Sequence, residues 1–380
     1  MDDELDVEPL VLQRFRRDIR AGDYQFIFAH NGVEALEVLN TSEDRIDMVV
    51  SDINMPQMDG LTLLEQIPKV DPNIRSVIVS AYGDMGNIRT AMNRGAFDFV
   101  TKPIDFEDLK VTIDRTLRHL EEWRAALSAR DNLVALQNEL NVAHDMQQSI
   151  LPTVFPNDSR YHLHATMAPA RNVGGDFYDV IRLANDRVGL AIADVSDKGV
   201  PAALFMMSSR TLLKGTAIGA EDPGEVLTEV NSLLSEDNDS AMFVTLLYAY
   251  YDPVDGSLVY ANGGHNSPLV VRADGGVEFL PYTKGIALGV APVFTYKSDS
   301  FKIDPGDTII LYTDGVSEAM NEGGEEFGTK RMEDVFAGKP PMSSEEATTM
   351  LCDALREFVG ETTQSDDITC LTLYRPRSAS

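Results

Sequence analysis

A stretch without glycine or proline, residues 117–150, divides this chain of 380 residues into two parts. The stretch is rich in Ala, Leu, Glu, Arg and Gln, which all favour helix, so it predicts one long helix. A chain of this length exceeds one ordinary hydrophobic core, and two domains with a connector are expected. We expect a first domain at 1–116, a helical connector at 117–150, a second domain at 151–375 and a disordered tail at 376–380.

An apolar seam runs along the connector, and its members step by three and four residues. They are Leu133, Leu136, Leu140 and Ala143. Such a stripe must pack against another surface. It favours a two-stranded coiled coil that joins a homodimer. Because the heptads are few and imperfect, packing on the chain's own domains is the alternative.

The charge balance excludes several classes of partner. Lys and Arg number 32 against 61 Asp and Glu, a net charge of −29, whereas nucleic acids and anionic membranes bind basic patches. The acidic N-terminus lacks the features of a signal peptide, and no apolar run approaches the ~20 residues of a membrane span. Two cysteines, Cys352 and Cys370, give no disulfide framework. We therefore expect a cytoplasmic protein that binds neither nucleic acid nor membrane.

In the first domain, Asp52 ends an apolar run and leads into a loop with Pro56 and Gly60. The loops beyond the carboxyl ends of parallel strands form the reactive crevice of an open α/β sheet. Asp52 is therefore a candidate reactive carboxylate. An ordinary turn aspartate before Asn and Pro is the alternative.

Other polar residues lie at comparable places in the first domain. The acidic pair Asp2 and Asp3 precedes a helical pattern, and Ser80 and Lys102 each follow an apolar run. Together with Asp52 they supply three carboxylates, a hydroxyl and an ammonium group. Mg²⁺ prefers oxygen ligands, and lysine is a mobile positive charge for a phosphoryl oxygen. The pattern predicts a magnesium and phosphate site.

Three motifs in this order, at 52–60, 80–84 and 102–103, resemble the receiver domain of two-component response regulators. The resemblance implies a flavodoxin-like α/β fold with a parallel sheet. It also implies that a sensor histidine kinase phosphorylates Asp52 and that the acidic pair and Asp52 hold Mg²⁺.

The same resemblance implies further roles. Ser80 and Lys102 would contact the phosphoryl group, and Phe99 would be the switch aromatic. The plain alternatives are a strand-end hydroxyl, a solvated charge and a core aromatic.

The first domain departs from the family at its start. The family has a central apolar strand immediately before the acidic pair, and this chain begins at the pair. In the 2-1-3-4-5 strand order that strand lies inside the sheet, so its loss leaves ladder groups of both neighbours unpaired. We expect either a start that lies upstream or a compromised receiver with its first strand missing.

The second part contains short β-branched and aromatic runs separated by Gly, Asn and Pro, for example at 188–193, 243–250 and 308–312. These near-continuous apolar runs suit buried strands, so a layered α+β domain with packed sheets is expected.

Aspartates recur at the ends of these runs, and single Asp-Gly pairs are common in turns. The residues are Asp176, Asp194, Asp314, Asp366 and Asp367. If the strands lie side by side, the carboxylates meet, and close like charges then require cations. Oxygen ligands favour Mg²⁺ or Mn²⁺ over zinc. A pair of such ions activates water for phosphoryl hydrolysis, and no Ser/His/Asp triad or catalytic Cys motif competes.

The motifs at 170–179, 193–203, 263–268, 313–318 and 366–369 resemble the metal-dependent PPM (protein phosphatase 2C-like) superfamily. They are most similar to the bacterial branch that dephosphorylates anti-sigma-factor antagonists. The resemblance implies a β-sandwich flanked by helices and two metal ions in the site.

By this resemblance Asp194 bridges the two ions, and Asp176 and the Val195 carbonyl serve one of them. Asp314 and Asp366 serve the other. These four aspartates are the candidate catalytic residues.

Other residues near these motifs have two readings. Asp367 is the less favoured metal ligand of its pair, and Arg171 is either a clamp for the substrate phosphate or a surface charge. His265 and Asn266 either order the site or cap strands, and the second reading is favoured.

The sequence therefore predicts a response regulator whose output is a phosphoserine or phosphothreonine protein phosphatase controlled by Asp52. Its predicted substrate is a phosphorylated anti-sigma-factor antagonist. A non-catalytic adaptor that binds a sigma factor or its antagonist is the alternative, but such relatives usually lose the metal aspartates that this chain retains. A diguanylate cyclase is excluded, because the Gly-Gly-Asp-Phe-Tyr segment lacks that family's glutamate and other motifs.

Overall fold

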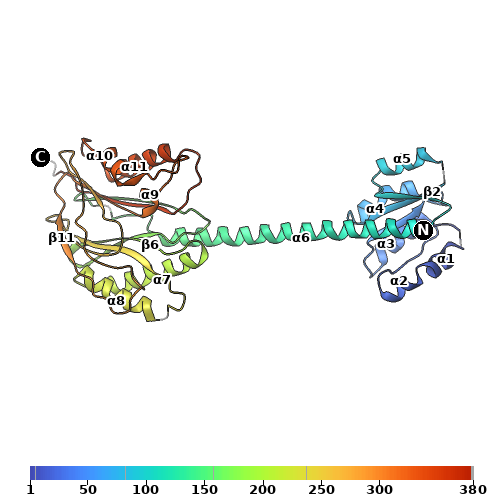
Figure 1. Ribbon diagram of the computed structural model, residues 1–380, viewed down its shortest axis with the longest axis horizontal. Coiled ribbons are helices and arrows are strands. Elements are labelled where there is room, and N and C mark those ends of the chain that lie inside the picture. The colour runs from blue at the N-terminus through green and yellow to red at the C-terminus, as the bar shows by residue number, and fades with distance from the viewer. Residues whose placement is uncertain (5, 82, 157, 237, 378–380) are drawn as a thin grey trace. The chain divides into compact units, whose positions relative to one another are not determined.

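The structure is a computed structural model that describes residues 1–4, 6–81, 83–156, 158–236 and 238–377 (Figure 1). It divides into two compact units, Met1–Ala135 and Leu136–Ser380. Tyr82, in the motif at 80–84, and residues 378–380 of the expected tail lie outside the described residues. None of the helices described is both long enough and apolar enough to cross a membrane.

The first unit contains a parallel three-stranded sheet in the order β1-β2-β3. Its strands are β1 (Met48–Asp52), β2 (Arg75–Ala81) and β3 (Asp98–Lys102). Its helices are α1 (Val7–Arg14), α2 (Arg16–Ala21), α3 (Gly32–Thr41), α4 (Gly60–Val70), α5 (Met85–Asn93) and the first part of α6 (Phe106–Ile150).

Neighbouring residues of β2 face opposite sides of this sheet. Val77 packs among residues of α1 and α6, whereas Ile78 packs among residues of α4 and α5. Helices therefore cover both faces, which is the usual environment of a parallel sheet. The helix starts are capped, since the Asn31 side chain accepts N–H groups at the start of α3 and Asp59 does so at α4.

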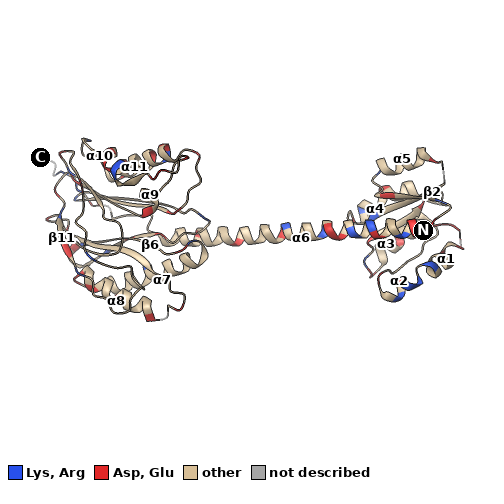
Figure 2. Ribbon diagram, in the orientation of Figure 1, with Lys and Arg blue, Asp and Glu red and all other residues tan. Residues whose placement is uncertain are grey.

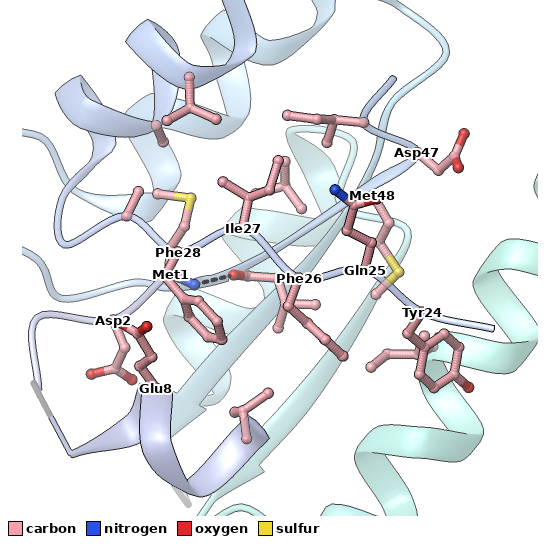
Figure 3. Close-up of a pocket in the computed structure, with 18 of the residues that line it drawn as sticks. Met1, Asp2, Glu8, Tyr24, Gln25, Phe26, Ile27, Phe28, Asp47 and Met48 are labelled. Atoms are coloured by element: carbon pink, nitrogen blue, oxygen red, sulfur yellow. Dashed lines mark hydrogen bonds between the residues drawn. The ribbon is translucent and has the colours of Figure 1, made fainter. Parts of the chain in front are cut away.

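A cavity of about 420 Å³ lies between β1 and the segment 24–29, where a further strand would complete the sheet (Figure 3). Among the described residues, Met1 is the one that bonds to this edge of β1. Its amino group donates to the Val50 carbonyl at 2.8 Å, and its carbonyl accepts the Asp52 N–H at 3.1 Å. No described strand pairs with β1 on this side.

The segment 24–29 is itself rich in aromatic and β-branched residues but forms no strand. Within the described ranges, no main-chain group of this segment has a hydrogen-bonded partner. The physical reason is that its neighbour in the sheet would be the missing central strand, so it has no ladder to join.

The second unit contains two antiparallel five-stranded sheets, with the orders β11-β8-β7-β6-β5 and β10-β9-β12-β13-β4. The strands of the first are β5 (Phe177–Arg182), β6 (Val188–Val195), β7 (Val244–Tyr251), β8 (Ser257–Gly263) and β11 (Asp299–Lys302). Those of the second are β4 (His162–Ala168), β9 (Leu269–Val271), β10 (Val277–Phe279), β12 (Thr308–Tyr312) and β13 (Ile368–Tyr374).

Helices flank this pair of sheets (Figure 1). They are α7 (Val200–Ala217), α8 (Pro223–Glu236), α9 (Asp314–Ser317), α10 (Gly328–Phe336) and α11 (Ser344–Val359), with a short 3-10 turn at Ala184–Asp186. Along β12, Ile309 and Leu311 enter the core shared with β6, α7 and α8, while Ile310 and Tyr312 pack with α10 and α11. The alternation makes a β-sandwich flanked by helices, as the sequence predicts.

The connecting helix α6 begins at Phe106, inside the range expected for the first domain. The Asp105 side chain accepts the Glu107 N–H and thereby caps its start. Leu109 and Ile113 of α6 are buried in the first unit, whereas Leu133 and Leu136 are 67% and 53% exposed.

Candidate active site

The two sheets of the second unit bring its aspartates to one end of the sandwich. Asp176 directly precedes β5 and Asp194 lies near the end of β6, and these strands pair with Phe177 opposite Ala193. Asp314 follows β12 and Asp366 precedes β13, which pair in the other sheet. The chain order scatters these residues, and the sheet order places them at neighbouring strand ends. Among the described residues, no three of them have carboxylate oxygens that all lie within 4.8 Å of one another, whereas Asp2, Asp3 and Asp52 do.

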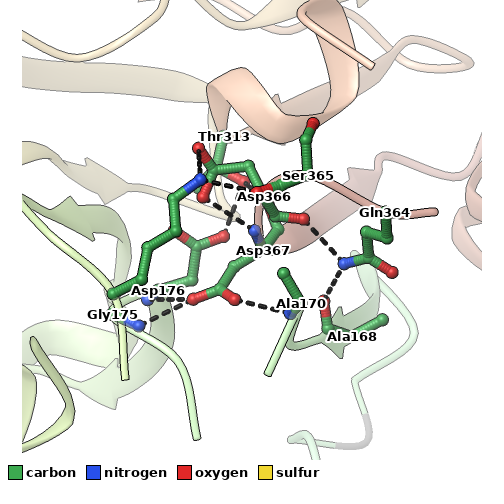
Figure 4. Close-up of polar contacts among 10 residues, drawn as sticks. Ala168, Ala170, Gly175, Asp176, Thr313, Gln364, Ser365, Asp366 and Asp367 are labelled. Carbon is green, nitrogen blue, oxygen red and sulfur yellow. Dashed lines mark hydrogen bonds and ion pairs between the residues drawn. The ribbon is translucent and has the colours of Figure 1, made fainter. Parts of the chain in front are cut away.

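Asp176 is the most enclosed of the group and has one unpaired oxygen. Its Oδ2 accepts the Thr313 hydroxyl at 2.7 Å (Figure 4), but its Oδ1 is buried without a hydrogen-bond partner among the described residues. Burial, followed by the charge of Asp194, raises the pKa of Asp176 well above its ordinary value. A buried carboxylate oxygen without a donor fits coordination by a metal ion.

The pKa values of Asp194 and Asp314 are raised as well. Burial and the nearby charge of Asp314 raise the pKa of Asp194 to about 7. Burial and Asp366 raise the pKa of Asp314, and the positive charge of Lys198 opposes that rise. Because gathered carboxylates repel each other, divalent cations would stabilise their ionised forms.

Glycines allow the backbone to approach this site closely. A Cβ atom at Gly175 would lie 3.0 Å from the Val195 carbonyl oxygen, and one at Gly315 would lie 1.9 Å from the Asp367 carbonyl oxygen. Larger residues would displace the segments that carry Asp176 and Asp314. The Val195 carbonyl, which the sequence assigns to one ion, faces this crowded region.

Asp367 is buried and supports the neighbouring backbone. Its carboxylate accepts the N–H groups of Ala170 and Gly175 at 2.7 Å and of Asp176 at 3.4 Å (Figure 4). Both of its oxygens are therefore occupied by main-chain donors. This geometry makes Asp367 an anchor of the Asp176 loop and leaves Asp366 as the carboxylate of the pair that faces the other aspartates.

Helix α6 also holds the Asp176 loop. Gln147 is 2% exposed, its side-chain nitrogen donates to the Gly174 carbonyl at 2.7 Å, and its side-chain oxygen accepts the Gly174 N–H at 3.0 Å. His144 Nδ1 lies 2.7 Å from the Asn172 carbonyl oxygen. Sequence reasoning missed Gln147, although it continues the spacing of the apolar seam as a polar residue four positions after Ala143.

The remaining candidates surround the cluster. Arg171 is exposed, and its Nη1 would lie 3.7 Å from a Cβ at Gly199. His265 is buried, with its ring nitrogens 2.8 Å from the Thr245 hydroxyl and 3.2 Å from the Tyr312 carbonyl oxygen. It ties the two sheets together, and burial lowers its pKa to about 4.

The receiver residues lie together in the first unit. Oxygens of Asp2, Asp3 and Asp52 all lie within 4.8 Å of one another. Lys102 Nζ is 2.5 Å from Asp52 Oδ2 and 3.1 Å from Asp2 Oδ2. Burial lowers the pKa of Lys102, but these hydrogen bonds outweigh it and raise the value to about 12.

Two further receiver candidates flank this group. The Ser80 hydroxyl is buried without a partner among the described residues, and the Phe99 ring is 37% exposed. An unpaired hydroxyl beside three carboxylates and an ammonium group fits an oxyanion with its magnesium ion.

These folds and sites define a receiver domain followed by a protein phosphatase 2C-type domain. The family described as Stage II sporulation protein E (SpoIIE) matches residues 184–376, and the response regulator receiver domain matches residues 5–114. The chain belongs to the Stage II sporulation protein E family.

Two curated relatives are similar to parts of this chain. Protein IcfG of Synechocystis sp. is 34% identical over 269 residues, which are 62% of this chain and 41% of that protein. Phosphoserine phosphatase RsbU of Bacillus subtilis is 30% identical over 189 residues, which are 50% of this chain and 56% of that protein. The chain thus spans about half the length of these relatives.

Solved structures agree with the fold of the second unit. The SiaA-PP2C domain of Pseudomonas aeruginosa superposes with a TM-score of 0.55 at 27% identity, covering 64% of this chain and 98% of that one. The phosphatase domain of the Bacillus subtilis cell fate determinant SpoIIE, with a fragment of its regulatory domain, has a TM-score of 0.50 at 21% identity, covering 57% and 63%. This second likeness shows the fold alone.

Proposed function

We propose that this protein is a response regulator that hydrolyses phosphoserine or phosphothreonine on a regulatory protein. The observation that carries the proposal is the buried, unpaired Oδ1 of Asp176 within a group of carboxylates of raised pKa. A non-catalytic adaptor has no need for such a costly arrangement. The similarity to the phosphoserine phosphatase RsbU favours a phosphoserine substrate. The resemblance of the motifs to the bacterial PPM branch favours a phosphorylated anti-sigma-factor antagonist as the protein that carries it.

The proposed metal ligands are the residues at the strand ends of the two sheets. Asp194 would be shared by two ions, Asp176 and the Val195 carbonyl would hold one of them, and Asp314 and Asp366 would hold the other. Two bound Mg²⁺ or Mn²⁺ ions supply a water of lowered pKa for attack on phosphorus. The protein holds its carboxylates ionised and oriented, and Arg171 stands at the exposed rim where a substrate phosphate would arrive.

In the receiver, a sensor histidine kinase transfers its phosphoryl group to Asp52. Asp2, Asp3 and Asp52 hold Mg²⁺, and Ser80 and Lys102 meet the phosphoryl oxygens. Phe99 is the aromatic that changes position. The proposal is supported by the contact of Lys102 with Asp52 and by the unpaired Ser80 hydroxyl.

Helix α6 is the proposed route between the two activities. It begins in the receiver at Phe106 and ends at Ile150. In its last turn Gln147 bonds to the main chain of Gly174, which lies two residues before Asp176. A rotation or shift of the helix would therefore move a metal ligand. Coupling of this kind requires two packings of the helix that phosphorylation biases.

The exposed middle of α6 favours a homodimer. Beyond Asp131 the helix carries no Lys or Arg, and its acidic residues there are Glu139 and Asp145 (Figure 2). Leu133 and Leu136 are exposed there, and an apolar, weakly charged helix face suits a second helix. We propose a cytoplasmic homodimer joined through this face.

The test is phosphate release by the full chain from a phosphoserine peptide with Mn²⁺, with and without beryllofluoride as the acyl-phosphate mimic. We expect turnover that changes when beryllofluoride is added. The Asp52→Asn chain should keep the unstimulated rate and lose the response. Absence of turnover in both states would refute the enzyme, whereas turnover indifferent to beryllofluoride would refute only the control.

A further inference from the structure

Lys198 occupies a turn that returns its side chain to the acidic cluster. It lies between β6 and α7, and its neighbours Asp197 and Gly199 have φ angles of 69° and 81°. Left-handed backbone on both sides makes a sharp reversal, which is uncommon for a residue such as aspartate. Lys198 Nζ lies 2.8 Å from Asp366 Oδ2 and 2.6 Å from the Ser365 carbonyl oxygen.

The contact is specific to one oxygen of Asp366. The other oxygen, Oδ1, accepts the Asp367 N–H at 2.9 Å and is fixed by the main chain. Oδ2 is therefore the oxygen without a main-chain donor, and it is the one that Lys198 holds. The side chains of Lys198 and Asp366 are 36% and 34% exposed, so both can adjust without unfolding the core.

Lys198 is also the local source of positive charge. Within the described part of the chain, no other Lys or Arg forms an ion pair with the five aspartates of the site. A single ammonium group cannot balance five carboxylates. It does, however, repel a dication a few ångströms away, and this repulsion is large in a partly buried site.

We propose that Lys198 competes with the divalent ion for Asp366 and thereby sets the metal affinity of the phosphatase site. This inference rests on the proposed function, because it assumes that Asp366 binds an ion. The Lys198 ammonium group occupies Asp366 Oδ2, and an ion must displace it to bind there. The positive charge of Lys198 therefore weakens metal binding.

The experiment is calorimetric titration with Mn²⁺ of full chains that all carry Asp52→Asn, which weakens the receiver's own metal site. Lys198→Met removes the charge, Lys198→Arg keeps it, and Lys214→Met removes an exposed charge further along α7. We expect Lys198→Met to bind Mn²⁺ roughly tenfold more tightly. Lys198→Arg should stay within about threefold of the parent chain, and Lys214→Met should match it.

Unchanged or weaker Mn²⁺ binding by Lys198→Met would overturn the proposal, since a residue that only orients Asp366 would weaken binding when removed. Thermal melting of each variant identifies any that fail to fold. If Lys198→Met does not fold, the Mn²⁺ affinity of Lys198→Arg, which retains the charge, is the remaining measurement. If the parent chain shows no saturable Mn²⁺ binding in the phosphatase domain, the proposed function fails, and this inference with it.

Discussion

The two acidic sites of this protein use the same residue types in different surroundings. In the receiver, Lys102 touches two of the three carboxylates, and these contacts raise the pKa of Lys102 to about 12. In the phosphatase domain, burial raises the pKa values of Asp176, Asp194 and Asp314, and the single contact from Lys198 does not offset it. The receiver has a lysine in contact with two of its carboxylates, whereas among the described residues only Asp366 of the five phosphatase aspartates has an ion pair.

The sheets that carry these two sites also differ in how completely their strands are hydrogen-bonded. The phosphatase site joins two complete sheets, so residues from four strands are fixed by continuous ladders. The receiver site stands at the end of a sheet with an empty place beside β1. We therefore expect the phosphatase site to be most sensitive to removal of its carboxylates or ions. We expect the receiver site to be most sensitive to changes in the order of the backbone beside β1.

The largest effect is expected from Asp194→Asn, which removes the carboxylate assigned to both ions. Phosphate release should fall by more than about 100-fold, beyond the range for residues that merely support a metal ligand. Initial rates at saturating Mn²⁺ measure it, with exposed Asp239→Asn as the control. A rate within tenfold of the parent rate would show that Asp194 is not an essential metal ligand, and it would contradict the proposed difference between the two sites.

Gln147→Leu tests whether the phosphatase site depends on support from α6. The substitution removes both hydrogen bonds to Gly174 and leaves its main chain unpaired. We expect a rate about 10 to 100 times lower, as for the loss of a group that orients a metal ligand. Gln137→Leu, on an exposed position of the same helix, is the matched control. Equal rates in the two variants would contradict the role of Gln147.

The receiver side of the comparison is tested by adding five β-branched apolar residues before Met1. Such a strand can fill the cavity and pair with β1 and the segment 24–29. After the entropy of ordering is subtracted, we expect stabilisation of roughly 2 kcal/mol in the receiver transition. Thermal melts and slowed hydrogen exchange at Val50 report it. An extension of Gly and Ser is the control, and equal melts for both would show that the cavity does not accept a strand.

The smallest effect is a pH dependence of stability without metal. The folded pKa of Asp194, about 7, is above the ordinary 3.8, so the folded protein binds more protons between these values. The free energy of unfolding should therefore rise as pH falls from 8 to 6.5, by about 1 kcal/mol. The low pKa of His265 opposes this rise as the pH nears its ordinary value of 6.5, where the unfolded side chain is half protonated and the opposing effect is roughly 0.4 kcal/mol. Melts at both pH values measure the change, and saturating Mn²⁺ should abolish it.

The sequence predicted the positions of the aspartates because each one ends or adjoins an apolar strand, and strand ends converge in a layered fold. It also predicted the gap in the receiver, because the acidic pair stands at residues 2 and 3. Both inferences depend on local pattern and strand order alone.

Other features depended on contacts between distant segments. Thr313 and Asp367 gain their roles from bonds to the Asp176 loop, more than a hundred residues away. The sequence offered Asp367 only as the less favoured metal ligand of its pair, and it did not single out Thr313. The sequence predicted a long helix that continues out of the first domain and placed the connector between the domains at 117–150. In the structure the cap at Asp105 starts the helix earlier.

The two hydrogen bonds between Gln147 and Gly174 also determine where the phosphatase domain can be cut from the chain. A fragment cut at Leu151, where the apolar pattern of the second part begins, would lack the last turn of α6 and expose the carbonyl and N–H of Gly174 to water. A fragment that begins several turns earlier in the helix would retain both bonds. The useful boundary for a free-standing catalytic piece therefore lies within the connector.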